Sequence, residues 1–198
     1  PDKIYTVRHV SLTDDQIKHY MSLKNAAIAL LDDGDLVSAP AVMTQLLRLQ
    51  QVLCGHLMTD DGDLVEFKTR RIDALLETIE EMSGGVIIWS RFRYDIRNIE
   101  AALKKAYGED STVNYYGDTS DSDRELAIKR FQDRDARFFV GNPQTAGKGL
   151  TLNAASNVIY YANDFNLESR VQSEDRCHRI GQKNTVTYVD FVSKGTVD

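Results

Sequence analysis

Two arginines stand three residues apart in a polar run near the C-terminus, and their chemistry suits anions. The run extends from Gln172 to Gln182 and contains Arg176 and Arg179. If the run is helical, residues three apart share one face. Two planar guanidinium groups on one face can pair with carboxylates or clamp phosphate oxygens. Taken alone, the spacing favours ion pairing at the surface over a phosphate clamp.

The same run contains Cys177 and His178, which suggest a metal site or a cysteine nucleophile. No second Cys/His pair in the sequence has a zinc-binding spacing, so the pattern disfavours a metal site. Adjacent helical residues point about 100° apart, so His178 is poorly placed to activate Cys177. We therefore expect neither metal binding nor cysteine catalysis.

A glycine-rich segment at residues 141–149 is similar to a phosphate-binding P-loop, but its spacing is wrong. It has one residue too many between its first glycine and the Gly-Lys pair. The lysine is followed by Gly149, where a P-loop needs Ser or Thr to hold magnesium. Two interpretations remain: a flexible surface loop, or a backbone cradle for an external phosphate to which Thr145 adds a hydroxyl.

The elements that must position these residues alternate between short apolar strands and helices. We expect strands at residues 86–89, 112–116, 137–140, 158–162 and 185–192, and helices at 72–79, 96–103, 122–131 and 167–179. This order predicts an α/β fold with a parallel sheet and helices on both faces. Ligands bind at the carboxyl ends of such strands, so the loops after Trp89, Tyr116, Val140 and Ala162 should be functional.

The first third of the chain is expected to be helical. Thr13 and Gln16 have capping-box spacing at the start of a helix to Leu31, and a second helix should run from about Pro40 to Leu57. The acidic stretch at 59–63 lacks a complete calcium-binding loop, so we expect a solvated turn. We divide the chain into a helical segment, 1–66, and an α/β domain, 67–198.

Composition excludes several classes of protein. The 198 residues carry a net charge of −6, from 24 Lys and Arg against 30 Asp and Glu, with 42% hydrophobic residues. These values exclude a disordered tail, a disulfide scaffold and a membrane protein, whose spanning helix would need about 20 apolar residues. The acidic balance disfavours a wholly basic nucleic-acid coat but allows a local basic groove. Two distant cysteines are typical of a reducing, intracellular environment.

The segment from Gln172 to Gln182 resembles the sixth helicase motif of the Swi/Snf family, superfamily-two ATPases that translocate on duplex DNA. Residues 145–153 are similar to the fifth motif and residues 86–92 to the fourth. Tyr116 to Ser120, followed by Arg124 and Phe131, resembles the segment between them. Residues 46–54 and 189–197 resemble the helix before the second motor domain and its closing strand. The resemblance covers nearly the whole chain and implies a RecA-like C-terminal motor lobe. Short connections between the motifs favour a bacterial or phage member.

The resemblance also implies roles for individual residues. Arg176 and Arg179 would act as arginine fingers on ATP, with support from Gln172, Gly149 and Asp175. The DNA backbone would be contacted by Ser90, Arg91, Thr119, Thr145, Gly147 and Lys148. Neither a P-loop nor an acidic Walker B segment is found in the sequence, so ATP and Mg²⁺ would be bound mainly by an N-terminal motor lobe.

The expected function is therefore ATP-dependent translocation on double-stranded DNA by a longer, soluble, intracellular protein. It would act in the cytoplasm of a bacterium or phage host, or in the nucleus of a eukaryote. Alone, this chain should hydrolyse no ATP. Two alternatives remain: a non-catalytic module that binds nucleic acid or a partner, and a strand-separating helicase of the same superfamily.

Overall fold

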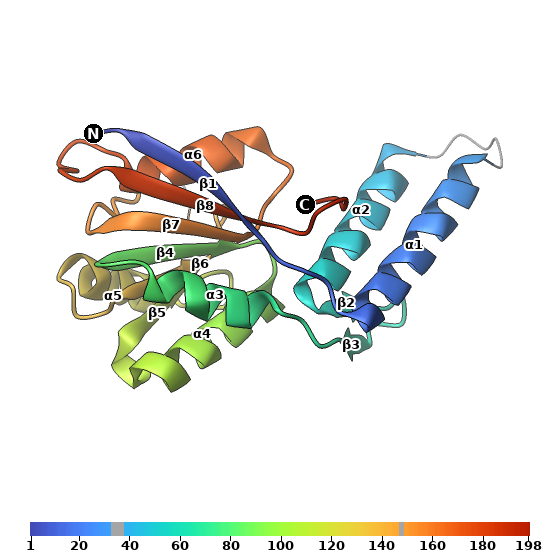
Figure 1. Ribbon diagram of the computed structural model, residues 1–198. Helices are drawn as coiled ribbons and strands as arrows, with labels where there is room; N and C mark the ends of the chain where they lie inside the picture. The colour runs from blue at the N-terminus through green and yellow to red at the C-terminus, as the bar shows by residue number, and fades with distance from the viewer. Residues whose placement is uncertain (33–37, 147–148) are drawn as a thin grey trace. The chain divides into compact units, whose positions relative to one another are not determined.

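Helices and strands alternate along residues 1–32, 38–146 and 149–198, which the computed structural model describes (Figure 1). They form two units, each with its own hydrophobic core. The first contains Pro1–Arg8 and Ile72–Phe191, and the second contains His9–Arg71 and Val192–Asp198. The described helices include none that is long and apolar enough to cross a membrane.

The first unit is built on a six-stranded sheet with the order β1-β8-β7-β4-β6-β5. Its strands are β1 (Lys3–His9), β4 (Gly85–Ser90), β5 (Thr112–Tyr115), β6 (Phe138–Gly141), β7 (Ala155–Ala162) and β8 (Val186–Val192). The central strands pair in parallel: Ile88 of β4 lies opposite Val140 of β6 on one side and Ile159 of β7 on the other. At the edge, the Val186 amide donates to the Asp2 carbonyl at 3.0 Å.

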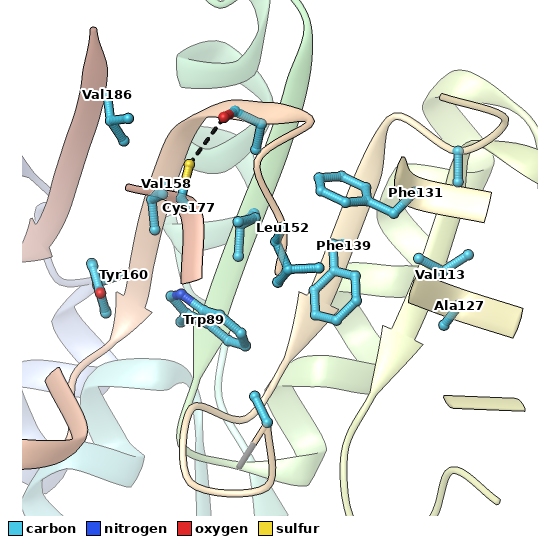
Figure 2. Packing of buried hydrophobic residues seen from close by; sticks show 14 of the residues in the cluster. Trp89, Val113, Ala127, Phe131, Phe139, Leu152, Val158, Tyr160, Cys177 and Val186 are labelled. Carbon is cyan, nitrogen blue, oxygen red and sulfur yellow. Dashed lines mark hydrogen bonds between the residues drawn. The ribbon is translucent and has the colours of Figure 1, made fainter. Parts of the chain in front are cut away.

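Helices cover both faces of this sheet, as predicted. They are α3 (Arg71–Glu80), α4 (Arg93–Tyr107), α5 (Asp121–Gln132) and α6 (Leu167–Cys177), with a short 3₁₀ turn at Glu109–Ser111. In Figure 1, α3 and α4 lie in front of the sheet and α5 and α6 behind it. The α5 and α6 side is filled by Phe131, Cys177, Trp89 and Phe139, which pack in one buried cluster (Figure 2). The α/β class predicted from the sequence is therefore confirmed.

The second unit contains two helices and a hairpin. They are α1 (Asp14–Asp32), α2 (Ala39–Cys54), β2 (His56–Met58) and β3 (Leu64–Glu66), the two strands being antiparallel. The predicted capping box is present: the Thr13 amide donates to Gln16 Oε1 at 3.0 Å, and the Gln16 amide donates to Thr13 Oγ1 at 3.3 Å. The Gln16 side chain also donates to the Val52 carbonyl at 2.9 Å, which holds α1 against α2.

Several predicted boundaries were wrong for local reasons. The second helix ends at Cys54, before the predicted Leu57, because Gly55 adopts a left-handed conformation with φ of 92°. Helix α5 is capped by Ser120, whose side chain accepts from the Asp123 amide, so it begins one residue before the predicted Ser122. Strand β1 and the β2–β3 hairpin were not predicted. Because β1 joins the sheet, the first eight residues belong to the α/β unit and not to the helical segment.

Candidate functional site

Helix α6 places Arg176 in its last turn but ends before Arg179. Its first turn is capped by Asn166, whose side chain accepts from the Glu168 and Ser169 amides at 2.9 and 3.2 Å. After Cys177 the backbone leaves the helical conformation at His178, with φ of −89° and ψ of 80°. The prediction that both arginines share one helix face was therefore wrong, because the helix was expected to continue to residue 179.

Arg176 is a largely buried cation. Only 8% of the residue is exposed, and its guanidinium makes no hydrogen bond or ion pair with the residues that the structure describes. Burial lowers the pKa of Arg176, and repulsion from the Arg179 charge lowers it further. A desolvated charge without a counterion is unfavourable, so an anion that reaches this group would stabilise it. The residue therefore has the chemistry of an anion-binding site.

Arg179 is exposed and is held by the segment after the glycine-rich loop. Its Nη1 donates to the Leu150 carbonyl at 3.0 Å and to Thr151 Oγ1 at 3.2 Å. A longer contact of 3.4 Å joins it to the carbonyl of Gly149, an exposed residue with φ of 102°. The expectation that the arginines pair loosely with Asp175 or Glu174 was wrong. Glu174 pairs with Arg170, and Asp175 lies 3.6 Å from Lys3.

A cavity of about 670 Å³ opens beside the two arginines. It is lined by Pro1, Asp175, Arg176, His178, Arg179, Ile180, Gly181 and Gln182. Its volume falls within the range of about 300–1,000 Å³ that is usual for small-molecule sites. The cavity thus brings together Arg176, Arg179 and Asp175 of the residues expected to serve ATP. It excludes Gln172, whose Nε2 donates to Glu168 Oε1 at 2.8 Å one turn earlier.

Gln182 fixes the floor of this cavity, a role that the sequence did not reveal. Its Nε2 donates to the Ala155 carbonyl at 2.7 Å and to the Cys177 carbonyl at 3.2 Å. The thiol of Cys177 donates to the same Ala155 carbonyl at 3.0 Å (Figure 2). Burial raises the pKa of this thiol to about 12. Cys177 is therefore a structural residue, which agrees with the expectation that it is no nucleophile.

Asn142 joins two loops at the carboxyl edge of the sheet. Its Nδ2 donates to the Arg91 carbonyl at 2.9 Å, and its Oδ1 accepts from the Gln144 and Thr145 amides at 2.9 and 3.3 Å. Gln144 in turn bonds to Asp164 in the loop after β7. The prediction that Arg91 and Thr145 lie at the same edge of the sheet is therefore confirmed. Gly147 and Lys148, predicted to lie beside them, fall outside the described residues.

Two other residues expected to contact DNA have their hydroxyl groups bonded within the fold. Ser90 is fully buried, and its Oγ donates to Asp95 Oδ2 at 2.8 Å. Thr119 is part-buried, and its Oγ1 donates to Asn114 Oδ1 at 2.7 Å. Ser90 therefore positions its loop and is not exposed to a ligand. Arg91, which follows it, lies with its guanidinium 5.7 Å from the centre of the Phe165 ring.

The described residues contain no group of three or more His, Cys, Asp or Glu side chains placed to hold a metal ion. Arg176 and Arg179, by contrast, present positive charge to one cavity, with Asp175 the only carboxylate among the lining residues. The arrangement fits phosphate oxygens better than a cation.

Comparison with known proteins defines the class. The chain matches the helicase conserved C-terminal domain family over residues 68–181, more than half of its length, and it belongs to that family. Two solved structures share its fold. The SWI2/SNF2 ATPase core of Sulfolobus solfataricus in complex with dsDNA has a TM-score of 0.77 and 24% identity, covering 99% of this chain and 42% of that one. The C-terminal part of the Fun30 ATPase domain also has a TM-score of 0.77, with 19% identity and coverage of 99% and 86%.

Relatives within the family are Swi/Snf ATPases. The chain is 32% identical over 144 residues to the SWI/SNF-related matrix-associated actin-dependent regulator of chromatin subfamily A containing DEAD/H box 1 homolog of Caenorhabditis elegans, covering 72% of the chain and 14% of that protein. It is 31% identical over 143 residues to the chromatin-remodeling ATPase INO80 of Homo sapiens, with coverage of 72% and 9%. The chain thus spans a small part of each relative. It is a RecA-like C-terminal helicase lobe of the Swi/Snf type.

Proposed function

We propose that this lobe supplies Arg176 and Arg179 to ATP hydrolysis in a double-stranded DNA translocase that acts inside the cell. The observation that carries the proposal is the largely buried guanidinium of Arg176, which lacks a counterion among the described residues and lines a nucleotide-sized cavity. Negative charge arriving at this cavity would relieve both the desolvation of Arg176 and its repulsion by Arg179. This chemistry supports a role for both residues at a phosphate group.

The two arginines have different preparation for that role. Arg179 is held by three oxygen atoms of residues 149–151, which fixes its position before any ligand arrives. Arg176 keeps its donors available, so it can form a planar fork with two phosphate oxygens. When bound, ATP with Mg²⁺ supplies the phosphoryl group whose charge these residues stabilise. An N-terminal lobe of the same protein would hold most of that nucleotide, because this chain contains no P-loop.

The loops after β4 and β6 would contact the DNA backbone. Arg91 and Thr145 lie at one edge of the sheet and are linked through Asn142. Lys148 belongs to the second of these loops by sequence. The Sulfolobus relative carries double-stranded DNA in its printed description, which supports the same ligand here. Contacts of this kind bind phosphates without reading bases, so binding should be tolerant of sequence and sensitive to salt.

The test is the ATPase activity of the full-length protein at saturating DNA. Arg176→Ala and Arg179→Ala should each lower kcat strongly, since arginine fingers contribute about 10³–10⁵ in rate. Arg176→Lys should not restore the rate, because lysine lacks the planar fork. ATP affinity should change less than kcat, because the contribution is largest in the transition state.

A suitable control is Lys129→Met, which removes an exposed cation that pairs with Asp133 on α5, away from the cavity lining. It should leave kcat unchanged. Near-normal rates in both arginine variants would contradict the proposal. DNA-stimulated ATP turnover by residues 1–198 alone would contradict the division of labour between two lobes.

A further inference from the structure

Arg170 of α6 is the centre of a polar cluster that none of the helicase motifs explains. Its two terminal nitrogens bond to both carboxylate oxygens of Asp190 on β8, the longer bond being 3.0 Å. The guanidinium carbon lies 3.5 Å from the centre of the Tyr160 ring on β7. Nη1 also donates to Asn163 Oδ1 at 3.0 Å. The side chain therefore ties α6 to two neighbouring strands of the sheet.

The same guanidinium reaches along the helix to Glu174. Arg170 Nε donates to Glu174 Oε1 at 2.8 Å. The other oxygen, Oε2, accepts from the Tyr5 hydroxyl at 2.7 Å and from Lys3 Nζ at 3.3 Å, both on β1. Burial alone would raise the pKa of Glu174, but the bonds from Tyr5, Arg170 and Lys3 together lower it. Glu174 is therefore ionised and held from two directions at neutral pH.

These bonds fix the last turn of α6 at several points. Besides Arg170 and Glu174, Ser173 lies 2.6 Å from the Tyr160 hydroxyl, and Cys177 donates to the Ala155 carbonyl. Arg176 belongs to the same turn but makes no such bond with the described residues. Its direction into the cavity is consequently set by its neighbours, because a rotation of the helix would break the contacts on either side of it.

We propose that Arg170 is a positioning residue that acts through Glu174 to hold Arg176 for catalysis. The inference rests on the proposed function of Arg176 and adds a residue to it. A loss of the fork to Asp190 would loosen the last turn of α6 without removing any group from the cavity. Misplacement of a reacting group by about 1 Å can cost about a hundredfold in rate. The effect should therefore fall on kcat and leave KM for ATP and the affinity for DNA within a few fold.

The experiment is a double-mutant cycle in the full-length protein. Arg170→Met should lower kcat by tenfold to a hundredfold, on the order expected for such a displacement. It should also weaken binding of ADP with aluminium fluoride, a mimic of the transferring phosphate, relative to ADP alone. In an Arg176→Ala background, Arg170→Met should have less than about a twofold further effect on either quantity, since residues that act as a unit are not additive.

The matched control is Arg8→Met. Arg8 also joins a strand to a helix through a carboxylate, Glu77 at 2.8 Å, but it contacts α3 and not α6. It should leave kcat unchanged even if stability falls by a similar amount. Asp190→Asn weakens the same fork with a smaller change in packing, so it replaces Arg170→Met if that variant fails to fold.

Each outcome decides between the proposals. If Arg170→Met lowers kcat by the same factor with and without Arg176, the positioning role is wrong and Arg170 is only structural. The same conclusion follows if the Arg8 control loses as much kcat as Arg170→Met. If Arg176→Ala itself keeps a normal kcat, the proposed function fails, and the positioning role fails with it.

Discussion

Glu174 and Arg176 lie two residues apart in the last turn of α6 and have opposite environments. The Glu174 carboxylate bonds to Tyr5, Lys3 and Arg170, while the Arg176 guanidinium has no charged partner among the described residues. Residues two apart on a helix point to different sides, so the acid cannot turn to neutralise the arginine. The fold therefore keeps one cation available at the cavity, although the chain as a whole is acidic.

The first prediction concerns DNA binding. A full-length variant with Arg91, Thr145 and Lys148 all replaced by alanine should bind double-stranded DNA more weakly than the native protein. Its binding should also depend less on salt, because each lost phosphate contact reduces the logarithmic salt slope by about 0.9. Titrations at several salt concentrations measure both quantities.

The control for this variant is Lys105→Ala. Lys105 is exposed in the last turn of α4, and that helix leads to the amino end of β5, at the opposite edge of the sheet. It should change neither affinity nor slope. An unchanged slope in the triple variant would show that these loops do not lie on the DNA path.

How much of the fold the sequence predicts depends on how deeply each element is buried. Strands β4 and β6 are buried along almost their whole length, so each reads as a short apolar run. Strand β1 is largely exposed and mixes Ile4, Tyr5 and Val7 with polar residues, so no apolar run marks it. An edge strand of this kind is recognisable only when its neighbour β8 is known.

The site shows the same division. The order of residues in 172–182 was enough to identify the helicase motif, but not to tell which arginine is buried. That difference arises because α6 ends at Cys177, and the helical pattern does not mark this end. Asn142 and Arg170 were missed because their roles depend on partners distant in the sequence, such as the Arg91 carbonyl and Asp190.

The second prediction concerns the buried amide of Gln182. Gln182→Met keeps a similar volume but removes the bonds to the Ala155 and Cys177 carbonyls. A buried polar group left without its partner costs about 1–3 kcal/mol, so the free energy of unfolding should fall by that amount. Urea denaturation measures it. Gln172→Met, which loses a bond between partly exposed side chains, should change stability by less than about 0.5 kcal/mol.

The third prediction compares two glycines with the same backbone conformation. Gly108 and Gly181 both have φ of 100°, a region that residues with a Cβ rarely adopt. A Cβ on Gly108 would meet open space, but one on Gly181 would lie 2.9 Å from Asn153 Nδ2. Both alanine variants should be destabilised by backbone strain of about 1–3 kcal/mol. Only Gly181→Ala should also displace the turn that carries Arg179, and so lower kcat in the full-length protein.

Equal kcat values in the two glycine variants would contradict this account. The comparison separates strain from displacement because the strain is the same at both positions. Gly108 lies between α4 and the 3₁₀ turn, and it does not line the cavity beside Arg176.

The last prediction concerns the stability of the second unit at acid pH. His56 at the start of β2 is only 3% exposed, and burial lowers its pKa from 6.5 to about 4. The unfolded chain therefore binds a proton at this residue at a higher pH than the folded chain does. Stability rises with pH wherever the unfolded state binds more protons, so it should fall as the pH decreases from about 6.5 to about 4. The size of the shift corresponds to a loss of roughly 3 kcal/mol at the lower limit. Denaturation of residues 1–198 in urea at several pH values would measure this loss. His56→Gln should make the dependence much shallower above pH 4.5, where Glu174 stays ionised. An unchanged slope in that variant would show that His56 is not the group responsible.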